Sequence, residues 1–138
     1  MAKANKTYST KEGGFVPPHD IEAEKSVIGA LLVDKDAIVK IVEFLQPLHF
    51  YLQDNQKVYE AIFRVYEGRK PADLITVPNE LKKMKALDNI GGVTYLTELV
   101  NTVPSAANIV NYAHLIRDDY VKRSLISVSG DIGTMVFE

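Results

Sequence analysis

The sequence predicts an all-α fold, a compact bundle of about six helices that ends in a long C-terminal helix. Apolar residues recur three and four positions apart through most of the chain, which is the spacing of one helix face. Nowhere do residues alternate between apolar and polar in a way that favours a strand, and the short extended candidate at 74–77 has no partner strand. Residues 105–138 contain no proline, so they can form one continuous helix.

The composition is that of a single globular domain. The chain has 138 residues, 46% of them hydrophobic and 25% charged, which is enough to bury a core. It contains no cysteine, which excludes disulfides, thiolate metal sites and a cysteine nucleophile, and fits a cytoplasmic protein. The formal net charge of -2 argues against tight nucleic-acid binding by this chain alone. No apolar run is long enough for a membrane span or a signal peptide.

The chain divides into three predicted parts. Residues 1–16 are polar and without periodicity, which predicts a disordered tail. Residues 17–104 carry short amphipathic stretches separated by Gly and Pro, which predict a globular helical head. Residues 105–138 predict the long helix.

Two helices are expected at the start of the head. Asp20 is placed to cap the first, and a second begins at Asp34 or Asp36 and stops before Pro47. The expected buried faces are Ile21, Val27, Ile28, Leu31 and Leu32 on the first helix, and Ile38, Ile41, Val42 and Leu45 on the second. An apolar turn of Leu48, Phe50 and Tyr51 is expected to fill the core after them.

Three further helices complete the head. The third begins at Asp54 or Asn55 and ends at Gly68, with Val58, Ala61, Ile62 and Val65 inward. Thr76 is expected to cap the short fourth, which tolerates Pro78 in its first turn. The Gly91-Gly92 pair predicts a turn before the fifth helix. The expected inward residues are Leu81 and Met84 on the fourth helix, and Tyr95, Leu96, Leu99 and Val100 on the fifth.

The long helix is predicted to begin after Pro104 with Ser105 as its N-cap. At about 1.5 Å per residue it would be about 50 Å long, whereas a small helical domain is only about 30 Å across. Its first apolar set suits a globular core, and its second set repeats like a coiled-coil seam, which favours pairing with another helix. The first set is Ile109, Tyr112, Ala113, Ile116 and Tyr120, and the predicted interface is Val121, Leu125, Val128, Ile132 and Met135.

Two alternatives compete with this interface. The second set could fold back on the head, although every head helix already has an inward face of its own. The set could also belong against a further helix, because the chain stops at Glu138 without a Gly, Asn or Pro C-cap. We therefore expect the natural gene to continue past this point.

No residue constellation predicts catalysis, a cofactor site or a metal site. The histidines at 19, 49 and 114 have no carboxylate or second histidine at ligand spacing, and Asp118-Asp119 point to different helix faces. There is no glycine-rich phosphate loop. A basic patch of Arg69, Lys70, Lys82, Lys83 and Lys85 has no interleaved aromatic residues, so a solvated helix face explains it better.

Several short sequence blocks are weak signals individually, but their order and spacing together form a specific pattern. They are PPHDIEAE at 17–24, SVIGALL at 26–32, FY at 50–51, ADLITV at 72–77, GGVTYL at 91–96, VPSAANI at 103–109 and YA at 112–113. Over about residues 17–138 the chain resembles the N-terminal part of DnaB-type replicative DNA helicases. It departs at Lys25, where members of that family often carry glutamine.

The resemblance implies a helical head followed by a helical hairpin, whose first arm would be residues 105–138. It implies self-association, in which hairpins pair and six subunits build a collar as a trimer of dimers. It also implies docking of the helicase-interaction domain of a DnaG-type primase, with a helicase loader as a further partner. ATP, Mg and single-stranded DNA would bind only in a later motor domain, so this fragment would not be an enzyme although its parent would be an ATP-dependent DNA helicase.

Two other functions remain open from the sequence. The primase C-terminal domain resembles this head in fold, although the Pro-Pro opening argues against it. A helical DNA-binding regulator would need a basic recognition helix, for which 82–85 is the only candidate.

Overall fold

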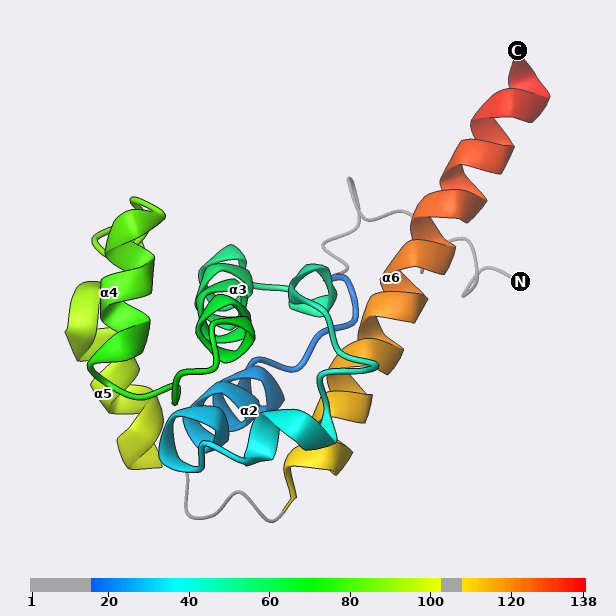
Figure 1. The fold of residues 1–138 in the computed structure, drawn as a ribbon. Helices are drawn as coiled ribbons and strands as arrows, with labels where there is room; N and C mark the ends of the chain where they lie inside the picture. Colours follow the sequence, from blue (N-terminus) through cyan, green and yellow to red (C-terminus); the bar gives the residue numbers. More distant parts are fainter. Residues whose placement is uncertain (1–15, 103–107) are drawn as a thin grey trace.

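The computed structural model describes residues 16–102 and 108–138, and it confirms the all-α fold (Figure 1). Its α-helices are α2 (Ile21–Val33), α3 (Gln53–Glu67), α4 (Thr76–Lys83), α5 (Gly92–Thr102) and α6 (Ile109–Phe137). Two short 3-10 helices, η1 (Ala37–Lys40) and η2 (Pro47–His49), lie between α2 and α3. No β-strand occurs in the two described ranges. Most of the predicted tail and the predicted cap Ser105 lie outside these ranges.

Helix α2 is the centre of the head, the name used here for residues 16–102. It packs against α3, α5 and α6, while α4 packs on α3. Figure 1 shows α4 and α5 at one end of the head and α6 at the other. Val27 and Ile28 on α2 are completely buried between these neighbours. The continuous apolar run 27–32 of α2 is buried at every position, because helices cover this half of α2 on several sides.

The start of α2 forms as predicted, since Asp20 accepts a hydrogen bond from the backbone N–H of Ala23 at 3.0 Å. Glu24, one turn later, is buried and only 1% exposed. Its carboxylate accepts hydrogen bonds from the backbone N–H groups of Tyr51 (2.7 Å) and Leu52 (3.3 Å). It therefore joins α2 to the segment that leads into α3.

The expected second helix is wrong in its type. Residues 37–40 form the 3-10 helix η1, followed by turns in which Ile41 N–H bonds to the Ile38 carbonyl and Leu45 N–H bonds to that of Ile41. The segment contains four β-branched residues, which lose rotamer freedom in a helix and lower its stability. Ile38, Ile41 and Leu45 are nevertheless buried, so the predicted inward side is correct.

Two predicted helix starts are shifted. Helix α3 begins at Gln53, one residue before Asp54, and Asn55 is fully buried rather than capping. At α4 the free amides are satisfied by Asp73, whose Oδ1 accepts from the N–H groups of Ile75 and Thr76, both at 2.8 Å. These amides lower the pKa of Asp73. The hydroxyl of Thr76 instead donates to the Pro71 carbonyl at 2.7 Å.

Helix α3 ends at Gly68 as predicted, but the left-handed residue is Arg69, with φ of 59°. The N–H of Arg69 bonds to the Tyr66 carbonyl, and that of Lys70 bonds to the Val65 carbonyl. This is the pattern of a Schellman C-cap, in which glycine normally takes the left-handed position.

The remaining turns match the sequence in part. Gly91 and Gly92 both have positive φ, 101° and 69°, which explains glycine at the turn before α5. Phe50 is buried as expected, whereas Leu48 is 61% exposed and so does not fill the core. Among the described residues, no helix combines the length and apolar character that a membrane crossing requires.

Candidate functional site

Helix α6 is the most unusual element of the structure, because much of it extends away from the head (Figure 1). It has 29 residues, so at about 1.5 Å per residue it is about 44 Å long. Its buried residues, Ile109, Ala113 and Ile116, all lie in the first third and pack with the core. The C-terminal part of α6 therefore has no cover from the head.

The predicted interface residues all lie in α6 beyond Ile116, its last buried residue, and we call them the α6 stripe. Their exposed fractions are Val121 45%, Leu125 63%, Val128 51%, Ile132 57% and Met135 70%. The alternative in which this set folds back on the head is thus not what the structure has. Apolar side chains are thus exposed on consecutive turns of this part of the helix.

The α6 stripe and the buried face of α6 lie on different sides of the helix. At about 100° per residue, the centre of the α6 stripe is roughly 110° around the helix from Ile109, Ala113 and Ile116. The head can therefore cover one face of α6 while the other stays exposed.

A groove runs along this open side. It has a volume of about 580 Å³, and its lining includes Pro18 from the head. The other lining residues come from α6 and are Lys122, Leu125, Ile126, Val128, Ser129 and Ile132. Three members of the α6 stripe thus share one concave surface with the residues next to them.

The head and the projecting part of α6 are joined by Arg123. Its guanidinium donates hydrogen bonds to the carbonyls of Pro18 (2.8 Å) and His49 (2.9 Å). It also lies over the rings of Tyr51 and Tyr120, at 5.3 and 5.8 Å from their centroids. This residue was not predicted from the sequence. The signal that could have found it is its position seven residues after Ile116, which places it on the head side of α6.

Each histidine packs against an aromatic ring. His19 stacks on Tyr51 with centroids 4.2 Å apart, His114 on Phe44 at 4.4 Å, and His49 lies at 4.7 Å from Tyr120. Burial, followed by the charges of Arg117 and Arg123, lowers the pKa of His49. In the ranges that the structure describes, no group of three or more His, Asp or Glu side chains could hold a metal ion.

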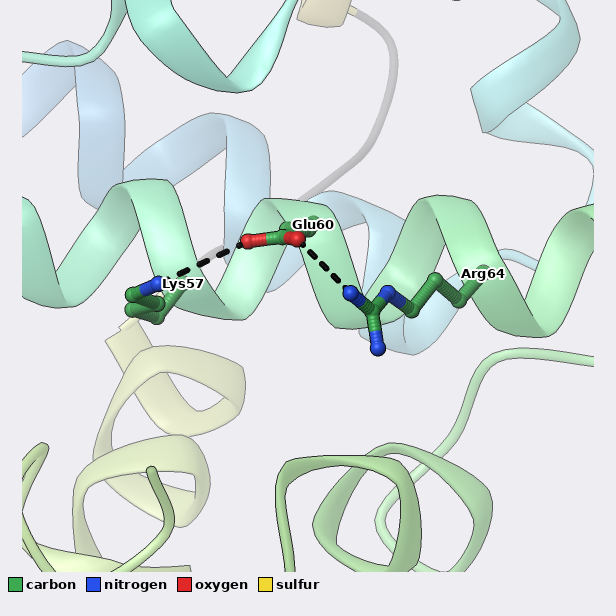
Figure 2. A network of polar contacts seen from close by, with 3 residues as sticks. All are labelled: Lys57, Glu60 and Arg64. Atoms are coloured by element: carbon green, nitrogen blue, oxygen red, sulfur yellow. Dashed lines mark hydrogen bonds and ion pairs between the residues drawn. The ribbon is translucent and has the colours of Figure 1, made fainter. Parts of the chain in front are cut away.

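The charged residues of α3 form an exposed network (Figure 2). Glu60 pairs with Arg64 at 3.0 Å and with Lys57 at 3.8 Å, one helical turn to either side. Such exposed pairs contribute only a few tenths of a kcal/mol. Of the predicted basic patch, Lys70 and Lys83 line one surface groove together with Arg64 and Glu80. The lining of this groove thus carries three basic side chains and one acidic side chain, and it contains no aromatic residue.

Comparison with known proteins gives one consistent result. The family model described as DnaB-like helicase N terminal domain matches residues 16–118. The chain is 43% identical over 117 residues to a replicative DNA helicase DnaB of Geobacillus stearothermophilus, covering 85% of this chain and 26% of that protein. It is 38% identical over 117 residues to the replicative DNA helicase DnaC of Bacillus subtilis, with the same coverage. The chain thus spans about a quarter of the length of these relatives.

A solved structure agrees with the sequence comparisons. The crystal structure of the N-terminal domain of DnaB helicase from Mycobacterium tuberculosis superposes with a TM-score of 0.86 and 39% identity. The match covers 88% of this chain and 87% of that one. The resemblance found in the short sequence blocks is therefore confirmed by sequence and by fold.

Proposed function

This chain belongs to the family of DnaB-like helicase N-terminal domains, and from that premise we propose that it serves assembly rather than catalysis. It pairs with a second copy of itself through the α6 stripe, within a collar of six subunits arranged as a trimer of dimers. It docks the helicase-interaction domain of a DnaG-type primase, and a helicase loader is a further partner. The whole protein, in the cytoplasm, unwinds duplex DNA with ATP and Mg in a motor domain.

The observation that supports self-association is the exposure of the whole α6 stripe. Its five residues are spaced four and three apart, which keeps them along one edge of the helix as in a coiled-coil seam. An α6 helix from a second copy could lie against this edge at a crossing angle of about 20°, the usual value for this packing. In a symmetric dimer the same surface is used on both partners.

The expected affinity of this chain alone is modest. Fully burying each of the five side chains contributes roughly 1.5–3 kcal/mol, about 8–15 kcal/mol together at most. Association costs about 4–15 kcal/mol in lost rigid-body freedom. Because the two quantities nearly cancel, we expect self-association that depends strongly on concentration.

Sedimentation equilibrium with one charge substitution tests the pairing. Val128→Asp places a carboxylate in the middle of the α6 stripe and should keep the chain monomeric at concentrations where the wild type associates. Val39→Asp is the matched control, since Val39 is 60% exposed but lies on η1, outside the α6 stripe. An unchanged mass distribution for Val128→Asp would count against the proposal.

Primase docking needs a separate measurement. Titration calorimetry with the helicase-interaction domain of the cognate primase should give saturable binding to this chain or to its associated form. Repeating it with Val128→Asp tells whether docking requires the pair. Absence of binding to both forms would remove this part of the proposal.

A further inference from the structure

The point where α6 leaves the head carries a cluster that the assembly proposal does not use. It consists of Arg123 with Pro18, His19, His49, Tyr51 and Tyr120, and we call it the Arg123 clasp. We infer that Arg123 is a positioning residue that fixes the direction in which the projecting part of α6 leaves the head.

The hydrogen bonds of Arg123 reach two separate parts of the head. One nitrogen donates to the carbonyl of Pro18, in the segment before α2, and the other to the carbonyl of His49, at the end of η2. Both acceptors are main-chain atoms, so their positions are set by the fold and not by side-chain rotamers. Two bonds to two fixed points restrict how the helix can turn about its own axis and how it can tilt.

Aromatic rings hold the guanidinium from other directions. Tyr51 comes from the head and Tyr120 from α6 itself, one turn before Arg123. A histidine supports each of these rings, His19 on Tyr51 and His49 beside Tyr120. A planar guanidinium can stack on such rings while it bonds in its own plane, which a lysine ammonium cannot do.

The position of Arg123 along α6 gives these contacts a large effect. Ile116 is the last buried residue of the helix, and Arg123 lies about 10 Å beyond it. About 21 Å of helix follows to Phe137 and carries every member of the α6 stripe except Val121. A tilt of about 10° at Arg123 would therefore move the far end by about 4 Å, about the distance between two carbon atoms in van der Waals contact, which is enough to break side-chain packing there.

The direction of α6 can be measured inside one molecule. The chain has no cysteine, so Glu98→Cys on α5 and Asp131→Cys on α6 give two unique sites for spin labels. Both positions are exposed. Double electron–electron resonance is measured on doubly labelled chains in the Val128→Asp background, diluted with an excess of the same chains without cysteine, so that it reports the distance within one molecule whether or not a second copy is bound.

The inference makes a specific prediction for this experiment. With Arg123 present the distance distribution has one narrow peak, and Arg123→Gln at least doubles its width. Arg123→Lys keeps the charge but loses the two-pronged geometry, so its width falls between the two. Lys122→Gln, which removes the adjacent exposed charge, leaves the distribution unchanged.

A distance distribution for Arg123→Gln as narrow as that of its parent would overturn the inference, provided near-ultraviolet circular dichroism shows an intact head. If Arg123→Gln fails to fold, Arg123→Lys and Tyr51→Leu carry the test, and narrow peaks for both overturn it.

The consequence for pairing is a further step that rests on the proposed function. If two copies meet through the α6 stripe, Arg123→Gln should weaken self-association several-fold in sedimentation equilibrium although it leaves the stripe itself intact. Failure of Val128→Asp to dissociate the pair would count against the proposed function and would leave the distance result unaffected. If Arg123→Gln broadens the distance distribution but leaves self-association unchanged, Arg123 acts only within a single subunit. That result would overturn the proposed effect of Arg123 on pairing.

Discussion

The side-chain amide of Asn55 donates a 2.9 Å hydrogen bond to the carboxylate of Glu24, and both residues are buried. The same amide group accepts from the Tyr95 hydroxyl through its oxygen at 2.5 Å. Burial, then the charges of Asp54 and Glu24, raises the pKa of Tyr95 to about 12. Three helices, α2, α3 and α5, thus meet in one satisfied polar network inside an apolar head.

The first prediction concerns this network. Glu24→Ala leaves the Tyr51 and Leu52 amides and the Asn55 side chain without their acceptor, so the free energy of unfolding should fall by about 3 kcal/mol. Glu22→Ala is the control, since Glu22 is exposed on the same helix. This substitution should change the free energy of unfolding by about 0.5 kcal/mol or less. Urea unfolding followed by circular dichroism measures both, and equal effects would contradict a special role for Glu24.

The second prediction concerns pH. Because the pKa of His49 is held below its ordinary value near 6.5, the unfolded chain takes up a proton at this residue more readily than the folded one. The unfolding free energy should therefore fall as the pH decreases from 7 through 6.5, and level off below the lowered pKa. Protonation would also remove the acceptor of the Gln46 N–H, which bonds to Nδ1 of His49 at 3.0 Å.

The variant His49→Gln should flatten this dependence, since it cannot take up the proton. Chemical unfolding at several values between pH 5 and 8 measures the slope for both proteins. If the unfolding free energy of the variant fell with decreasing pH as steeply as that of the wild type, groups other than His49 would cause the loss of stability.

The third prediction concerns Arg69, which holds a left-handed backbone after α3. An L-residue with a side chain is strained there by roughly 1–2 kcal/mol, whereas glycine is not. Arg69→Gly should therefore raise the free energy of unfolding by about 0.5–1 kcal/mol. Lys57→Gly, at an exposed position inside α3, should lower the free energy of unfolding by about 1 kcal/mol, and a loss of stability in both variants would rule out the backbone explanation.

The fourth prediction concerns the glycines of the projecting helix. A methyl group added at Gly130 or Gly133 would meet no atom within 4 Å, so alanine fits at both. Each change should stabilise the helix by about 1 kcal/mol, slowing hydrogen exchange of the amides in the projecting part. Gly91→Ala should instead destabilise the head, because Gly91 has φ of 101°. Unchanged hydrogen exchange of the α6 amides in the Gly130→Ala, Gly133→Ala double variant would contradict the predicted stabilisation of this helix.

Local patterns predicted much of the fold. Asp20 caps α2 and Gly68 ends α3 because these signals act within one helical turn and need no knowledge of the rest of the chain. The exposed α6 stripe was also visible, since its spacing differs from that of the buried face of the same helix. Its role as an interface stays a prediction.

Features that depend on distant parts of the chain were not predicted. Residues 37–45 carry a helical pattern, yet they form a 3-10 helix and turns while burying the same side chains. Glu24 lies in the first turn of α2, and only the fold brings the Tyr51 and Leu52 amides to it. Helical spacing places Arg123 on the head side of α6, but its acceptor is the carbonyl of Pro18, 105 positions earlier, and no local pattern identifies such a partner.

The rotation between the two apolar sides of α6 has a consequence for how such a chain can change over generations. Residues that pack with the core and residues of the α6 stripe, through which we propose that copies pair, occupy different sides of one helix, so either group can drift without disturbing the other. Under that proposal, a lineage can strengthen, loosen or retarget its contacts along the outer edge while the head keeps its stability.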